Sequence, residues 1–379
     1  MTKPNWNTIR DLFPAAKKYA YLATAGAPPI SIPASQAGIR YYEEMTSQGD
    51  LPWDRWLAEV ETVRAKTANF IGANPEEIAF TFSSSHGMNL VAQMFGTKGE
   101  ILTLADEFPS STLPWLQQRS TMRFIESDPT GLLPMRKIER AISPETRVIV
   151  TSSVQYRTGF YQDLIALGQL CHDRNILLAV DASQSIGAIP LNVHDARIDA
   201  LVFSGYKWTM AGYGIAVIYL AKRHIQSDRF PIAGWLSARQ PELLINNELD
   251  LKNSAAALEV GCPNFAGIFS LGAALDLLVK IGPSHIEARI HELTDYLHEV
   301  LHTRNFKIAS PSDRSDRAGI TIVVVQNPEE VVKALTQKNI LTAARGRGVR
   351  VSLHIFNTFE DVDRFVEALE EIEESEVAR

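Results

Sequence analysis

Lys207 stands in the stretch FSGYKWTM, residues 203–210, at the end of an apolar run that is typical of a buried strand. A lysine amine in such a place can form a Schiff base with a carbonyl group. The same lysine could also be an ordinary surface charge. The polar residues that follow other strand-like runs are needed to choose between these interpretations.

Asp181 ends a second apolar run, LLAVD, 26 residues before Lys207. A carboxylate at the end of a buried strand needs a charged or hydrogen-bonding partner to offset its desolvation. A third run, in FTFSSSHGMNL, stops at three serines, and we expect a helix to begin near His86. Ser84 and Ser85 would then offer an anion the N–H groups and dipole of a helix N-terminus. They could instead be plain N-caps.

These groups are expected to meet at one edge of one sheet, because ligands of open parallel sheets bind beyond the carboxyl ends of the strands. Ser204 and Lys207 would supply a hydroxyl and an amine, Asp181 a carboxylate, and the serines an anion cradle. Pyridoxal 5′-phosphate requires a lysine for its Schiff base, a carboxylate for its pyridine nitrogen and a site for its phosphate. The sequence therefore predicts a pyridoxal phosphate enzyme.

The segments around these residues alternate between strands and helices, which indicates an α/β protein with a mostly parallel sheet between helices. The strand-like runs are 77–82, 100–105, 147–152, 176–182, 199–205 and 214–220, with helices expected at 87–95 and 163–174. After about residue 265, two long amphipathic helices precede a short α+β segment. We expect an N-terminal segment at 1–18 that packs with the small domain, a large cofactor-binding domain at 19–265 and a small α+β C-terminal domain at 266–379.

Composition gives no sign of a nucleic-acid partner, because the net charge is −7 and no basic run is present. No uncharged apolar run reaches bilayer length, and the N-terminus lacks the apolar core of a signal peptide. Two cysteines, Cys171 and Cys262, are too few for a disulfide framework or a cysteine-based zinc site. The expectation is a cytoplasmic protein without a metal, a membrane contact or a nucleic-acid partner.

The stretch VDASQSIGAIPLNVHDARIDALVFSGYKW resembles the cofactor segment of the class V aminotransferase superfamily of fold-type I pyridoxal phosphate enzymes. Cysteine desulfurases, kynureninase, isopenicillin N epimerase, and several aminotransferases and C–S lyases belong to that superfamily. The likeness runs from YLATAGAPP to RVSLHIFNTFEDVDRFVEAL. It implies that Lys207 forms the Schiff base, that Asp181 pairs with the pyridine nitrogen and that Gln184 donates to the phenolic oxygen. The positions that match the family's phosphate ligands are Ser84, Ser85, Ser204 and Tyr206.

Two positions depart from the family's pattern. Phe108 stands where desulfurases carry a histidine stacked on the cofactor, and an aromatic ring can stack there but cannot relay a proton. It could also be a core phenylalanine. Cys262, in LEVGCPNFAGI, stands where relatives usually have threonine, in a segment that reaches the neighbouring subunit's phosphate. The resemblance therefore implies a homodimer with active sites at the interface.

The stretch AARGRGVRVSLHIFN resembles the small-domain segment that binds the substrate's α-carboxylate, with Arg350 as the matching arginine. A planar guanidinium pairs bidentately with a carboxylate, and Arg345 and Arg347 are further candidates. Arg350 could instead be a solvated charge at a strand end. Desulfurases carry a nucleophilic cysteine in the loop just before this segment, and none is present here. Desulfurase chemistry through a persulfide is therefore not expected.

The resemblance implies an enzyme acting at the Cα of an amino acid, with the freed Lys207 as general base and acid. Transamination is the first hypothesis, and β-elimination by a C–S lyase or Cα epimerisation are alternatives that share its early steps. A Rossmann-type nucleotide-binding module would need a G-x-G-x-x-G turn, which SSSHGMN lacks. A silent cofactor-binding protein would be favoured by loss of the lysine or the aspartate. Residues that could line the substrate pocket, or only pack, are His86, Tyr156, Trp53 and Trp56.

Overall fold

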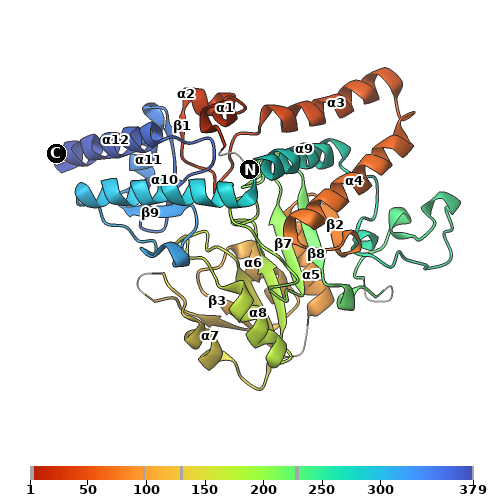
Figure 1. Cartoon of the computed structure of the whole chain (residues 1–379). Coiled ribbons are helices and arrows are strands. Elements are labelled where there is room, and N and C mark those ends of the chain that lie inside the picture. Colours follow the sequence, from red (N-terminus) through yellow and green to blue (C-terminus); the bar gives the residue numbers. More distant parts are fainter. Residues whose placement is uncertain (1–3, 97–98, 129–130, 227–229, 378–379) are drawn as a thin grey trace.

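A seven-stranded sheet forms the centre of the protein in this computed structural model, which describes residues 4–96, 99–128, 131–226 and 230–377 (Figure 1). The strand order is β2-β8-β7-β6-β5-β3-β4. In this order, the five strands from β7 to β4 run parallel to one another, whereas β8 runs antiparallel to both β2 and β7. The expected mostly parallel sheet is confirmed. The strands are β2 (Ile78–Thr81), β3 (Glu100–Leu104), β4 (Thr121–Ile125), β5 (Thr146–Ser152), β6 (Leu177–Asp181), β7 (Ala200–Ser204) and β8 (Ala216–Leu220).

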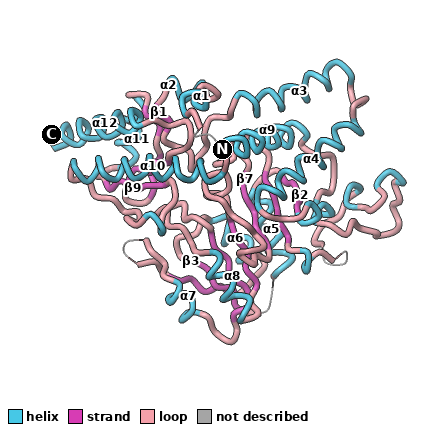
Figure 2. Tube along the Cα trace, in the orientation of Figure 1, coloured by secondary structure: helices cyan, strands magenta, loops and turns pink. Residues whose placement is uncertain are grey.

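Both faces of the sheet are covered by helices, so its inner strands are apolar on both sides (Figure 2). In β7, Leu201 and Phe203 belong to one core, whereas Ala200 and Val202 belong to another. This alternation follows from the two-residue period of a strand. The first core includes residues of α4 (Trp53–Ile71), α8 (Leu164–Asp173) and α9 (Phe265–Ile281), and the second includes residues of α5 (Ser84–Phe95) and α6 (Pro109–Gln117).

The C-terminal part forms a smaller α+β unit around a three-stranded antiparallel sheet with the order β11-β12-β9. Its side chains make a separate core with the helices that follow α9. The strands are β9 (Ile320–Val324), β11 (Ala343–Arg345) and β12 (Gly348–Ser352), and the helices are α10 (Pro283–Thr303), α11 (Pro328–Gln337) and α12 (Phe359–Val377). A short pair, β1 (Ala20–Tyr21) and β10 (Ile340–Leu341), joins the N-terminal part to this unit.

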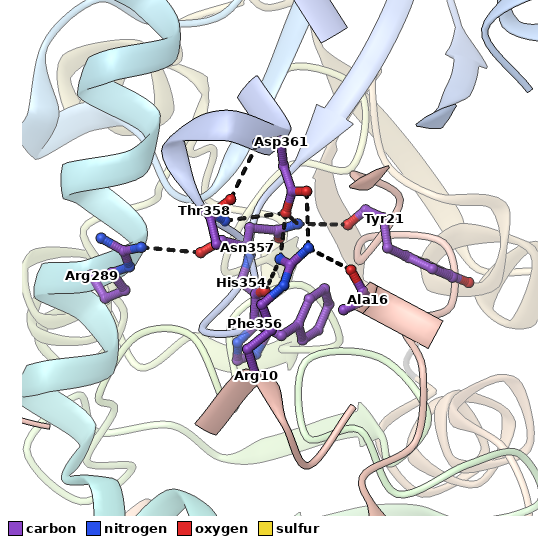
Figure 3. Close-up of polar contacts among 9 residues, drawn as sticks. All are labelled: Arg10, Ala16, Tyr21, Arg289, His354, Phe356, Asn357, Thr358 and Asp361. Atoms are coloured by element: carbon purple, nitrogen blue, oxygen red, sulfur yellow. Dashed lines mark hydrogen bonds and ion pairs between the residues drawn. The ribbon is translucent and has the colours of Figure 1, made fainter. Parts of the chain in front are cut away.

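The N-terminal segment is fixed to the small unit by Arg10, at the end of α1 (Trp6–Arg10) (Figure 3). Its guanidinium donates to the Asp361 carboxylate at 2.6 Å and to the backbone oxygens of Phe356 and Ala16, both at 2.5 Å. Ala16 lies in the second helix, α2 (Pro14–Lys18). One partly buried arginine therefore ties both N-terminal helices to the start of α12. The domain boundaries stay predictions, and residues 1–3 and 378–379 lie outside the described residues.

Helix α3 (Ile32–Gln48) lies beside α9, as does α4, and α7 (Met135–Ala141) contacts β4 and α8. In the described ranges, no single helix is long and apolar enough to cross a membrane. Helices α9 and α10 pass such a test only as a pair, by length and composition, and the chain bends by 79° between them.

Candidate active site

The serine turn, residues 83–85 after β2, differs from the expectation at one point. Helix α5 begins at Ser84, and its N-cap is Ser83, whose hydroxyl accepts from the His86 N–H at 3.1 Å. The alternative that Ser84 or Ser85 is a plain N-cap is therefore wrong. Both lie in the first helical turn, where backbone N–H groups have no intrahelical acceptor. The turn keeps the free N–H groups and two hydroxyls that an anion site needs.

Hydroxyl groups from three elements gather at the carboxyl end of β7. Ser204 is buried at the last residue of that strand, and its Oγ lies 2.9 Å from the Oγ of Ser84 and 3.2 Å from that of Ser183. Tyr206, two residues on, stacks on Tyr213 with ring centroids 4.4 Å apart. Burial raises the pKa of Tyr206, which keeps its hydroxyl a donor. The predicted phosphate ligands Ser84 and Ser204 are thus in contact.

Asp181 is buried at the end of β6, beside β7. Its Oδ2 accepts a hydrogen bond from the Ser111 hydroxyl at 2.9 Å, and its Oδ1 accepts one from the Ser183 N–H at 2.9 Å. Both oxygens of the carboxylate are therefore held by hydrogen-bond donors. A negative charge held in this way can pair with a protonated pyridine nitrogen.

Lys207 follows β7, and its side chain is buried, with 9% of the residue exposed. Its ammonium lies 5.5 Å from the centre of the Phe108 ring and 5.8 Å from that of Tyr206. Burial lowers the pKa of Lys207, against the opposing effect of the Asp181 charge. Within the described residues, no carboxylate lies at ion-pair distance from Lys207. The amine is therefore easier to deprotonate, as a Schiff-base lysine must be.

Phe108 is the N-cap residue of α6, and 40% of it is exposed, so it is not a core phenylalanine. Its ring meets that of Tyr156 edge to face, with centroids 5.3 Å apart. The hydroxyl of Ser110, in the same turn, lies 2.7 Å from that of Ser85. Phe108 thus presents an aromatic face beside the lysine amine, between the serine turn and Tyr156.

Gln184 is held by two contacts. Its Nε2 donates to the Ala25 oxygen at 3.0 Å, and its Oε1 accepts from the Trp208 indole at 2.8 Å. The second proton of Nε2 is left for another acceptor. The backbone oxygen of Trp208 in turn lies 2.9 Å from Nε2 of the fully buried His354, whose Nδ1 accepts from the Ile355 N–H at 2.7 Å. Sequence reasoning missed both Trp208 and His354.

Glu107 is a second buried carboxylate that sequence reasoning missed. It accepts hydrogen bonds from the Ser152 N–H and the Gln155 amide, both at 2.7 Å, and from the Ser152 hydroxyl. Burial raises the pKa of Glu107 to about 7. The charge of Asp181 acts in the same direction. The signal available in the sequence was an acidic residue directly before Phe108, after a buried strand.

Arg350 lies in the middle of β12 and is only 2% exposed, so it is not a solvated strand-end charge. Its Nη1 donates to the Tyr156 oxygen at 3.2 Å, while Nε and Nη2 are buried without a hydrogen-bond partner among the described residues. Burial lowers the pKa of Arg350 to about 9, and the charge of Arg345 adds to this. A buried guanidinium with two nitrogens that lack an acceptor suits a carboxylate that binds through both oxygens.

Other candidates lie outside this group. Cys262 is exposed and, with His86, lines a separate cavity of about 270 Å³. The His86 ring lies 2.5 Å from the Thr81 hydroxyl and stacks on Phe82. Trp56 is buried in the sheet core, and Trp53 packs against that core. We therefore assign the two tryptophans to packing.

Comparison with known proteins identifies the family of this chain. A model of the aminotransferase class-V family matches residues 20–365. The chain belongs to this family. A probable cysteine desulfurase of Methanothermobacter thermautotrophicus is 28% identical over 392 residues, covering 96% of this chain and 97% of that protein. A kynureninase of Shouchella clausii is 29% identical over 373 residues, covering 92% and 86%.

Solved structures agree with this assignment. The apo structure of a cysteine desulfurase from Thermococcus onnurineus superposes on the class-V chain with a TM-score of 0.90 at 26% identity, covering 99% of each chain. A C-DES variant with glycine covalently linked to pyridoxal phosphate gives 0.86 at 18% identity, over 97% of this chain and 100% of that one, which shows the shared fold. The expected fold class and the resemblance to the class V aminotransferases are confirmed.

Pyridoxal phosphate is the cofactor of the class-V family, so the predicted cofactor is also confirmed. The residues present fit it: a buried amine at Lys207, a hydrogen-bonded carboxylate at Asp181 and touching hydroxyls of Ser84 and Ser204. When bound, this cofactor withdraws electrons from the Cα of an attached amino acid.

Proposed function

We propose that this class-V enzyme transforms amino acids at Cα, with transamination as the reaction to test first. The observation that carries the proposal is the position of Lys207, a buried amine. Burial lowers the pKa of this amine, although the charge of Asp181 acts in the opposite direction. Such an amine can take a proton from a neighbouring carbon and return it elsewhere. A structural lysine would instead be paired with a carboxylate or reach solvent.

The remaining residues would hold the reactants. Asp181, fixed by Ser111 and Ser183, would keep a negative charge at the pyridine nitrogen. We assign the phosphate to the first turn of α5 and the hydroxyls beside it, and the α-carboxylate of the substrate to Arg350, whose Nε and Nη2 have no partner among the described residues. The proposed phosphate ligands are Ser84, Ser85, Ser204 and Tyr206.

Elimination by a C–S lyase and epimerisation remain alternatives, because both begin with removal of the same Cα proton. Persulfide chemistry has less support. Cys171 is buried in α8, where burial raises its thiol pKa to about 12, and Cys262 lines a cavity formed with residues of β2 and α9. Phe108 cannot relay a proton to a sulfur leaving group. The relatives named above as desulfurases therefore do not determine the reaction of this chain.

A panel of amino acids tests this function. Each would be added to the purified, cofactor-loaded enzyme while the visible absorption is followed and the product identified. One equivalent of oxo acid per cofactor, with the amino group kept on the cofactor and no ammonia released, supports transamination. Oxo acid released with ammonia and sulfide supports elimination, and inverted amino acid supports epimerisation. If no amino acid changes the absorption, amino-acid chemistry at this site is wrong.

We also propose that the active unit is a homodimer with its sites at the interface. Phe82, directly before the serine turn, is 62% exposed, and Tyr213, which stacks on Tyr206, is 73% exposed. Phe82 lines the same cavity as Cys262. Sedimentation of the loaded enzyme should give twice the chain mass, and a fully active monomer would contradict it. The cytoplasmic location expected from the sequence stays a prediction.

A further inference from the structure

Arg345 and Arg350 project from the same face of one β-hairpin. In the β11–β12 pair, Ala343 lies opposite Arg350, and Arg345 lies opposite Gly348. Directly opposite residues share a face of a sheet, and so do residues two apart along one strand. Arg345 is therefore the diagonal neighbour of Arg350. The glycine opposite Arg345 places no side chain across from it.

The charge of Arg345 acts on the site already described. After burial, the nearby charge of Arg345 is the next cause that lowers the pKa of Arg350. It also contributes to the lowered pKa of Lys207, behind burial and the charge of Arg350. A positive charge that acts on both groups lies close enough to act on a substrate held between them.

Among the described residues, Arg345 has no charged partner. Its guanidinium is exposed, and the one acceptor it has there is the neighbouring Ala344 oxygen, at 2.6 Å. No acidic side chain in the described part of the chain forms an ion pair with it, although it lines a cavity of about 340 Å³ that Asp106 and Asp128 also line. The Asp106 carboxylate pairs with Arg157 at 3.1 Å and accepts from the Ser127 hydroxyl at 2.5 Å, and the Asp128 Oδ1 accepts from the Leu132 N–H at 3.0 Å.

We propose that Arg345 binds a second anionic group, at the far end of the substrate's side chain, so that the enzyme prefers acidic amino acids. This rests on the function proposed above, in which Arg350 holds the α-carboxylate. Two guanidiniums on one face, one buried and one at the edge, match a ligand with two anionic groups joined by a short chain. A substrate with a neutral side chain would offer no anion for the Arg345 guanidinium to bind.

The first test uses matched pairs of amino acids, aspartate with asparagine and glutamate with glutamine. Their dissociation constants would be measured at pH 7.5 by titrating the absorption of the loaded enzyme. We expect the acidic member to bind about tenfold more tightly, as one charge-assisted pair would give. Arg345→Gln should abolish that preference and change binding of the neutral member less than about twofold.

Arg147→Gln is the matched control. Arg147 is also exposed, and among the described residues it also donates only to backbone oxygens, those of Pro144 and Thr146. It lies at the amino end of β5 in the seven-stranded sheet, whereas Asp181 and Lys207 lie at the carboxyl ends of β6 and β7. This variant removes the same net charge and should keep the preference for acidic amino acids. Loss of the preference in both variants would mean that overall charge causes it, which overturns the assignment of Arg345.

A second experiment tests the anion site of Arg345 independently of the proposed function. Glutarate and pentanoate have no amino group, so their calorimetric binding does not depend on amino-acid chemistry. Glutarate should bind more tightly than pentanoate, and only while Arg345 is present. Equal binding of the two, or a preference that survives Arg345→Gln, overturns the inference. If glutarate behaves as expected but no amino acid changes the absorption, the proposed function fails and the anion site remains.

Discussion

The indole nitrogen of Trp208 donates a 2.8 Å hydrogen bond to the side-chain oxygen of Gln184. Because the amide nitrogen of Gln184 donates to Ala25, this contact fixes which way the amide faces and leaves one N–H unused. Trp208 directly follows Lys207 in the chain. The residue after the proposed Schiff-base lysine therefore orients the group expected to meet the phenolic oxygen of the cofactor.

Trp208→Phe should release this orientation. The substitution leaves the buried Gln184 oxygen without a donor, at a cost of about 1–3 kcal/mol in unfolding free energy. Cofactor affinity should fall and the visible absorption should shift. Trp115→Phe is the control, because Trp115 is equally buried and its indole N–H has no partner among the described residues. Equal changes in the absorption of both variants would mean that Trp208 acts only by packing.

Arg350→Ala should leave cofactor binding intact, because Arg350 belongs to the small unit and not to the serine turn. Loss of a charge-assisted pair costs about 2–5 kcal/mol, or roughly 30-fold to several-thousand-fold in kcat/KM. Arg350→Lys should recover only part of this, because an ammonium cannot pair bidentately. An amine substrate without a carboxylate is the control and should react as before. If both substrates lose equally, Arg350 is structural.

A double variant, Cys171→Ala with Cys262→Ala, should keep most of its turnover with the true substrate. Neither thiol lies among the residues around Lys207, and Cys171 is enclosed in α8. Turnover would be compared with the wild type at equal cofactor content. A folded, loaded double variant without turnover would require a thiol mechanism.

Glu107 predicts a pH dependence of stability. Its pKa is raised by burial from 4.5 to about 7, so the folded protein keeps a proton that the unfolded chain releases above pH 4.5. The stability that this proton contributes is complete below pH 4.5 and is lost as the pH rises through 7. Relative to Glu107→Gln, the wild type should lose on the order of 3 kcal/mol across that range.

Urea unfolding of both proteins at several pH values between 4.5 and 8 measures this difference. Glu248→Gln, an exposed carboxylate, serves as the control and should follow the wild type. If Glu107→Gln also follows the wild type at every pH, the buried carboxylate is ionised throughout.

Strand positions followed from sequence wherever a strand is buried on both faces. The expected 176–182 and 199–205 became β6 (Leu177–Asp181) and β7 (Ala200–Ser204), because continuous apolar runs end there at polar residues. Strand β4 was missed. It is an edge strand, and only Ile125 of its five residues is buried, so it has no apolar run. The composition of β8 does not indicate that this strand runs antiparallel to its neighbours.

The site was predictable where one residue carries the chemistry and could not be predicted where contacts come from distant segments. Asp181 ends one recognisable strand, and Lys207 follows another. Glu107 is held by Ser152 and Gln155, 45 and 48 residues away, and His354 meets Trp208 across 146 residues. No local pattern encodes such pairs, because only the fold brings their segments together.

Reduction of the cofactor-loaded protein with borohydride, followed by peptide mapping, tests the central assignment most directly. Lys207 is a buried amine on which the charge of Asp181 acts, so the label should appear on the peptide containing Lys207 and on no other. Lys207→Ala, loaded and reduced in the same way, should carry no label. A label on another lysine, or an unchanged label in Lys207→Ala, would contradict the assignment.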